Sequence, residues 1–160
     1  MSQDQTFTES EAHRYFAIQF NSETWNLLEK AGRTKEEDER MVCAAFASCR
    51  HWLEAGTGVH HQRGEWLIAR VNAELGRGEP AQRHAERCLE LTEQHAGEMQ
   101  DFDLAYAYEA VARASAVAGD RDRAAEYLAL AQEAATAIAD ERSKKIFDGD
   151  LRTGDWRGLQ

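Results

Sequence analysis

The sequence LGRGEPAQRHAERCLEL at Leu75–Leu91 has a counterpart in AGDRDRAAEYLALA at Ala118–Ala131. In each segment the second residue is a glycine, Gly76 or Gly119, and small or apolar residues follow at helical spacing. Gly32 precedes a third segment of this kind, and the three glycines are separated by 44 and 43 residues. A fixed period of this length indicates a repeated supersecondary unit.

The positions five, nine and twelve residues after each glycine share a character. They are Ala81, Ala85 and Cys88 in one segment, Ala124, Leu128 and Ala131 in the next, and Glu37, Met41 and Ala44 in the first. Small side chains at these positions allow two helices to approach closely, because the side chains at a helix contact set the distance between the axes. The first segment departs from the pattern at Glu37.

Apolar periodicity and capping signals predict six long helices. Thr8 with Glu11, and Thr34 with Glu37, form possible capping boxes, while Pro80 suits the first turn of a helix. The expected helices span about 8–32, 34–56, 60–75, 80–95, 101–118 and 120–140, and a short helix is expected at 144–147 in a polar tail. A second apolar stripe on the 34–56 helix, formed by Val42, Phe46, Cys49 and Leu53, predicts that this helix is covered on more than one side.

A glycine turn followed by small residues at these three offsets resembles the second half of a tetratricopeptide repeat, whose usual period is about 34 residues. The resemblance implies an all-α fold: a right-handed stack of about three antiparallel helix pairs. We therefore expect one domain over 1–160, with repeats at about 8–56, 58–97 and 101–140 and a C-terminal cap at 141–160. The longer units leave the exact subfamily open.

Three further stretches, Gly64–Arg77, His84–Leu91 and Phe102–Ala110, resemble a family of uncharacterised bacterial proteins of this size. The resemblance covers roughly Arg14 to Asp140 and implies the same helical-repeat fold. It adds nothing about activity.

The charge balance narrows the range of partners. Nineteen basic residues against 29 acidic ones give a formal charge of -10, which repels phosphate backbones and anionic membranes. Met1 to Gln5 is polar and does not resemble a secretory signal, and no apolar run approaches the roughly 18 residues of a membrane span. The sequence therefore predicts a cytoplasmic protein with neither nucleic acid nor membrane as a partner.

No motif in the sequence indicates catalysis or a cofactor. Cys43, Cys49 and Cys88 lack CxxC spacing and are expected to be inert buried thiols. His61 with Glu65, and His84 with its helical neighbours Glu86 and Cys88, put donors within one turn, but a single helix supplies only two ligands in this way and the HExxH signature is absent. His51, beside Trp52, is expected to be a core or half-buried histidine whose ring nitrogen has a hydrogen-bond partner. With no nucleophile elbow or phosphate-binding loop either, we expect no metal, no cofactor and no enzymatic activity.

The remaining candidate is the inner face of the stack. Counting back six, ten and thirteen residues from Gly76 and Gly119 selects one set of side chains on the first helices of neighbouring repeats: Arg63, Trp66, Arg70, Tyr106, Glu109 and Arg113. Arginine and aromatic residues are common in recognition surfaces because they bury much area at low entropic cost. The alternative is that the aromatic rings are ordinary packing residues and the arginines form a solvated face.

These observations favour a non-catalytic protein-interaction module, whose partner is another protein or a second copy of the chain. The alternative function is a sensor that binds a small ligand or a metal in the arginine-lined groove.

Overall fold

The computed structural model describes residues 6–159, and in this part of the chain all regular structure is helical. The α-helices are α1 (Glu9–Leu28), α2 (Lys35–Ala55), α3 (Gly58–Glu74), α4 (Gly78–Gln94), α5 (Asp103–Ala118), α6 (Arg121–Ala134) and α7 (Glu141–Thr153), with 3₁₀ turns η1 (Ala96–Glu98) and η2 (Ala135–Ala137). None of the described helices combines the length and apolar character that a bilayer span requires. Met1 to Gln5, on which the expectation of no secretory signal depends, lies outside the described residues.

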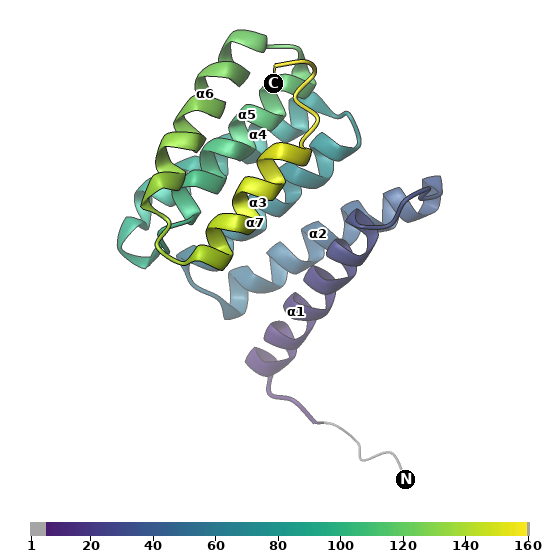
Figure 1. Ribbon diagram of the computed structural model, residues 1–160. Coiled ribbons are helices and arrows are strands. Elements are labelled where there is room, and N and C mark those ends of the chain that lie inside the picture. Colours follow the sequence, from purple (N-terminus) through teal and green to yellow (C-terminus); the bar gives the residue numbers. More distant parts are fainter. Residues whose placement is uncertain (1–5, 160) are drawn as a thin grey trace.

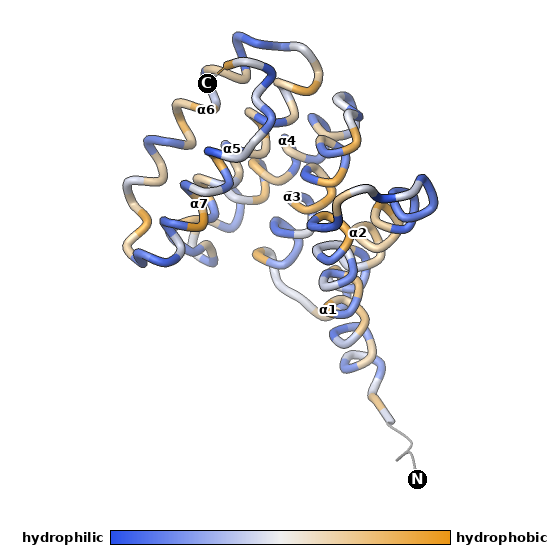
Figure 2. Tube along the Cα trace, turned by 45° about the vertical axis from the view of Figure 1, so that its right-hand side comes forward, coloured by the Kyte–Doolittle hydropathy of each residue, from blue (hydrophilic) through white to orange (hydrophobic). Residues whose placement is uncertain are grey.

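Helices that follow one another in the chain pack side by side. The most extensive contacts are between α1 and α2, between α3 and α4, and between α5 and α6; α2 also contacts α3, and both α3 and α4 contact α5 (Figure 1). The turn between α1 and α2 is hydrophilic (Figure 2). The all-helical class predicted from the sequence is therefore confirmed, with consecutive helices as neighbours.

The glycines of the internal period adopt the left-handed conformation. The φ angles are 67° at Gly32, 70° at Gly76 and 85° at Gly119. After α3 the amide of Arg77 donates to the carbonyl of Asn72 at 2.9 Å, and after α5 the amide of Asp120 donates to Ser115 at 2.9 Å. These equivalent bonds have the spacing of a Schellman motif, which satisfies carbonyls left open at a helix end.

The first turn of the period is built differently. The α1 helix ends at Leu28, four residues before Gly32, so the predicted end of this helix was too late. The Arg33 guanidinium donates instead to the carbonyls of Leu27, Leu28 and Lys30 at 3.1–3.2 Å. A side chain thus replaces the glycine motif at this helix end.

The departure at Glu37 also has a local explanation. Its carboxylate accepts the Thr34 amide at 3.0 Å and pairs with Lys30, while the Thr34 hydroxyl accepts the Glu37 amide at 3.2 Å. The predicted capping box is therefore present, and it uses the position at which the later repeats have alanine.

Small residues form the contacts between helices in the two later pairs. Ala81, Ala85 and Cys88 of α4 are fully buried, as are Ala124 and Ala131 of α6. A Cβ built on Gly78 would meet the Cα of Ala118 at 2.7 Å, so the start of α4 touches the end of α5. Close approach of this kind requires side chains no larger than these.

The C-terminal segment is more ordered than the sequence indicated. Asp140 caps α7 by accepting the Ser143 amide at 2.7 Å, and the helix continues to Thr153 instead of ending near 147. Phe147, Leu151 and Trp156 are buried in a core cluster with residues of α5 and α6. The signal was present as an apolar i, i+4 pair in an otherwise polar tail.

The second apolar stripe of α2 is covered only in part, with Cys49 buried and Val42 half-buried. Phe46 and Leu53 lie on an open surface of the helix and are 44% and 52% exposed. Cys43 shares this open surface and is exposed, which corrects its assignment as a buried thiol, whereas Cys49 and Cys88 are buried as expected. His51 is half-buried, and its Nδ1 lies 2.9 Å from Nδ1 of His13.

Replacement of Gly119 by Val should lower the free energy of unfolding by about 1–2 kcal/mol, the cost of a side chain in the left-handed region. A Cβ at this position meets no atom within 4 Å, so the loss comes from the backbone conformation alone. Gly97 is equally free of neighbours but has no positive φ, and Gly97→Val is the matched control. Urea denaturation measures the free energy of unfolding of both variants. Equal losses of stability in the two would contradict the left-handed conformation assigned to Gly119.

The native protein should react with a thiol reagent at one cysteine per chain, and at all three after denaturation. Burial, followed by the charge of Glu65, raises the pKa of the Cys49 thiol to about 12, and burial also raises the pKa of Cys88. Thiolate is the reactive form, so only Cys43 should be modified. Mass spectrometry of the alkylated protein identifies the modified cysteine. If the native Cys43→Ser variant were modified at the same rate as the wild type, the prediction that only Cys43 reacts would be wrong.

Candidate functional site

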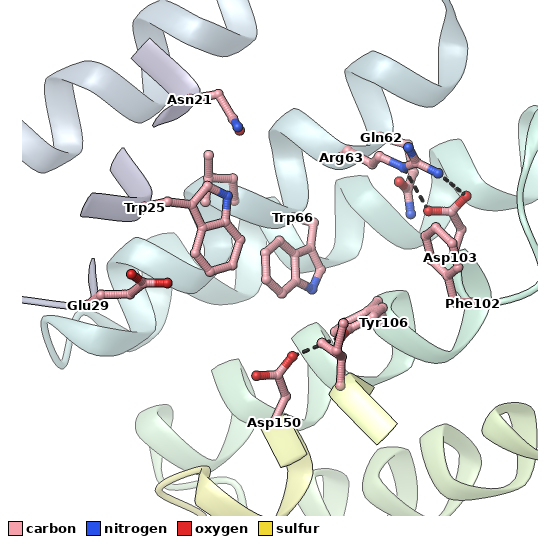
Figure 3. Close-up of a pocket in the computed structure, with 12 residues that line it drawn as sticks. Asn21, Trp25, Glu29, Gln62, Arg63, Trp66, Phe102, Asp103, Tyr106 and Asp150 are labelled. Carbon is pink, nitrogen blue, oxygen red and sulfur yellow. Dashed lines mark hydrogen bonds and ion pairs between the residues drawn. The ribbon is translucent and has the colours of Figure 1, made fainter. Parts of the chain in front are cut away.

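A groove with a volume of about 510 Å³ lies between α1 and α7. Asn21 and Trp25 of α1, with Glu29 at its end, form one side, and Ile146 and Asp150 of α7 contribute the other (Figure 3). Residues of α3, including Arg63 and Trp66, and the start of α5 with Tyr106 lie between them. The groove therefore draws its lining from four helices, two of them at opposite ends of the chain.

Aromatic rings follow one another along this groove. Trp25 stacks on Trp66 with ring centroids 5.8 Å apart and planes inclined by 23°. Trp66 meets Tyr106 edge to face at 5.5 Å, and Tyr106 meets Phe102 in the same way at 6.3 Å. The Trp25 side is open to solvent, since this residue is 37% exposed. The groove offers aromatic surface that a ligand can contact.

Two of these aromatic side chains are held in place by hydrogen bonds that their polar atoms donate. The indole Nε1 of Trp66 donates to Glu109 at 3.2 Å, and the Tyr106 hydroxyl donates to Asp150 at 2.8 Å. Burial, and then the hydrogen bond to Asp150, raise the pKa of the Tyr106 phenol, so it remains protonated as the donor. The hydrogen bond between Tyr106 and Asp150 also joins α5 to α7 across the groove.

The charged groups of the groove are mostly acidic. Arg63 forms a two-point ion pair with Asp103, both distances being 3.0 Å, and its guanidinium lies 5.1 Å from the Phe102 ring centroid (Figure 3). Glu29 and Asp150 also line the groove, and neither has a salt-bridge partner among residues 6–159. Three carboxylates against one already paired guanidinium give the groove a negative charge.

A buried ion pair lies beneath this surface. Glu109 is 1% exposed, accepts from Nε of Arg113 at 2.5 Å and has Nη1 of Arg70 at 3.9 Å. The Arg113 guanidinium also lies 4.8 Å from the ring centroid of the buried Trp156. Burial, and then the neighbouring charge of Arg113, lower the pKa of Arg70. Trp156 of the C-terminal segment thus covers the Arg113 side chain of α5.

The six side chains selected by counting from the glycines do come together. Arg63, Trp66 and Tyr106 line the groove, and Arg70 is half-buried beside Glu109. Glu109 and Arg113 are buried, so they support the groove from below and offer no surface to a partner.

Sequence reasoning missed the two side walls. Trp25 lies three residues beyond Ser22, the position found by counting back ten from Gly32, because the first turn differs from the others. Asp150 was missed because the tail was treated as polar and mostly irregular. The spacing of Phe147 and Leu151 was the available signal, since it places Asp150 on a helix.

No protein family, curated protein or solved structure matches this chain. The tetratricopeptide resemblance therefore remains a prediction from the residues.

Replacement of Arg113 by Met should lower the free energy of unfolding by about 3 kcal/mol, because the Glu109 charge would remain buried without its closest partner. Arg123 pairs with Glu86 at 2.8 Å on the surface, with side chains 32% and 48% exposed. Arg123→Met is therefore the control and should lose no more than about 1 kcal/mol. Similar midpoints of urea unfolding for the two variants would show that the buried Glu109 charge is not stabilised by Arg113.

Proposed function

We propose that this protein is a non-catalytic binding module with a tetratricopeptide-like stack of three helix pairs, and that its groove receives a basic segment of another protein. The observation that supports this most directly is the combination, in one open groove, of stacked tryptophans with two carboxylates, Glu29 and Asp150, that form no salt bridge among the described residues. Both properties favour a ligand that carries a positive charge.

The charges favour a cation. Glu29 and Asp150 come from α1 and α7, on opposite walls of the groove that also contains Trp25 and Trp66 (Figure 3). A Lys or Arg side chain between them would gain a cation–π interaction of about 0.5–1 kcal/mol at an exposed site, in addition to the attraction of the carboxylates. The formal charge of -10 on the whole chain acts in the same direction.

The surroundings of the cation site favour a peptide. Phe102, Ile146 and the Trp25 ring extend the apolar surface beyond the carboxylates, so side chains flanking the basic residue would also be covered. The pairing of consecutive helices and the matching turns at Gly76 and Gly119 support the repeat architecture, in which the first helices of each pair form the inner surface.

The pairing of the polar groups supports binding without catalysis. Asp103 is paired with Arg63, and Asp150 accepts from Tyr106, so these carboxylates are positioned as fixed charges.

A small cationic molecule is the second candidate. The volume of about 510 Å³ falls within the range of small-molecule sites, which is roughly 300–1,000 Å³. The same aromatic rings and carboxylates would bind it. It differs from a peptide in needing no flanking side chains.

Peptides with a central Lys or Arg between apolar residues should bind more tightly than the same peptides with Gln or Glu, and Glu29→Lys should weaken binding roughly tenfold, or about 1.4 kcal/mol. Affinity should fall as salt rises, because an exposed charge pair is screened. Quenching of tryptophan fluorescence measures binding, with Trp25→Phe to assign the signal.

The matched control is Glu39→Lys, which makes the same charge change on α2 outside the groove and should have little effect. Equal binding of the Glu peptides, or equal losses in the two variants, would overturn the proposal. Tetramethylammonium binding as tightly as the peptides would favour the small-ligand alternative. Dimerisation of the chain that Glu29→Lys abolishes would identify the partner segment as its own.

A further inference from the structure

A second group of side chains lies where α2, α3 and α4 meet. Cys49 of α2 is buried against Gly64 of α3, where a Cβ would approach its Sγ to 2.8 Å. On either side of Gly64, one helical turn apart, α3 carries His61 and Glu65. The missing side chain at Gly64 therefore lets the thiol reach the helix that carries the imidazole and the carboxylate.

The donor atoms of these three residues are close together. The Cys49 sulfur, one imidazole nitrogen of His61 and one carboxylate oxygen of Glu65 all lie within 4.8 Å of one another. The distance from His61 Nε2 to Glu65 Oε1 is 3.5 Å. The ligand atoms of a tetrahedral zinc are roughly 3.3–3.8 Å apart, given metal–ligand bonds of about 2.0–2.3 Å. Small side-chain movements bring all three donors to such distances.

A fourth residue holds the carboxylate in place. Nδ1 of His84, on α4, lies 2.6 Å from Oε2 of Glu65, while His61 faces the other oxygen. Hydrogen bonds of this kind orient the carboxylates that bind metals in proteins. His84 contacts the Phe46 ring edge to face at 5.3 Å, which restrains the imidazole.

The chemistry of the donors identifies a cation. A thiolate, an imidazole and a carboxylate are all zinc ligands, and the soft thiolate disfavours magnesium and calcium, which prefer oxygen. Side-chain exposures of 25% for His61 and 13% for Glu65 leave access to the site without placing it in bulk solvent. The arrangement differs from a surface acidic cluster because it has one carboxylate and three other potential donors.

We propose that Cys49, His61 and Glu65 bind one zinc ion and that His84 is a positioning residue for the Glu65 carboxylate. The thiol proton is released to solvent when the metal binds. The ligands come from α2 and α3, and His84 links them to α4, so the ion would hold the first helix pair to the second. The site is separate from the groove between α1 and α7. The sequence shows the His61 and Glu65 pair on one helix, but it does not show that Cys49 of another helix lies beside them.

Cobalt titration of tag-free protein tests the site. Co²⁺ should give a thiolate charge-transfer band in the near ultraviolet and visible d–d bands that saturate at one ion per chain, and Zn²⁺ should displace it. Cys49→Ser should remove the charge-transfer band, whereas Cys43→Ser, which alters an exposed thiol of the same helix, should leave it unchanged. No band in the wild type, or a band that persists in Cys49→Ser, would overturn the proposal.

Two variants of half-buried histidines separate metal binding from folding. His61→Ala should weaken Zn²⁺ binding at least tenfold at unchanged helicity by circular dichroism. His84→Gln should weaken it about 10- to 100-fold, the usual effect of removing a group that orients a ligand, and should retain the thiolate band. Unchanged affinity in His61→Ala would exclude the site. Glu29→Lys should bind cobalt normally, so failure of one site is distinguishable from failure of the other.

Discussion

Close contact between helices at residues with almost no side chain is the constraint on which the rest of this structure depends. Alanines at Ala81, Ala85, Ala124 and Ala131 are fully buried, and Gly78 touches the end of α5. Small side chains at such contacts let paired helices approach closely, so that dispersion contacts between them are numerous. They also restrict how the pairs can be aligned, since a larger side chain at any of these positions would push two helices apart.

This alignment brings the first helices of neighbouring pairs together, and Glu109 then organises what lies on them. Its carboxylate contacts Trp66 of α3 and Arg113 of its own helix, while Arg70 is nearby. A buried carboxylate needs several donors, because its desolvation is costly. The same residues that satisfy it therefore fix the Trp66 ring at the base of the groove, and α7 completes the arrangement through Tyr106 and Trp156.

The two proposed sites use different faces of α3. Arg63 and Trp66 face the groove, whereas His61 and Glu65 face α2 and α4. A zinc ion at the second site would stiffen the contact between the first two helix pairs, and α1 carries Trp25 and Glu29 on the opposite side of the first pair.

Most of the helices, the two capping boxes and the glycine turns after α3 and α5 were determined by the sequence alone, because each depends on residues only a few positions apart. Thr8 with Glu11, Thr34 with Glu37 and the left-handed Gly119 are local features of this kind. The period also predicted that Arg63, Trp66 and Tyr106 lie together. Only the tertiary structure decided that Arg113 is buried, that Trp25 and Asp150 form the walls, and that Cys49 reaches His61. These outcomes depend on the rotation of each helix about its own axis and on the place where α7 packs. Contacts between residues distant in the chain set both.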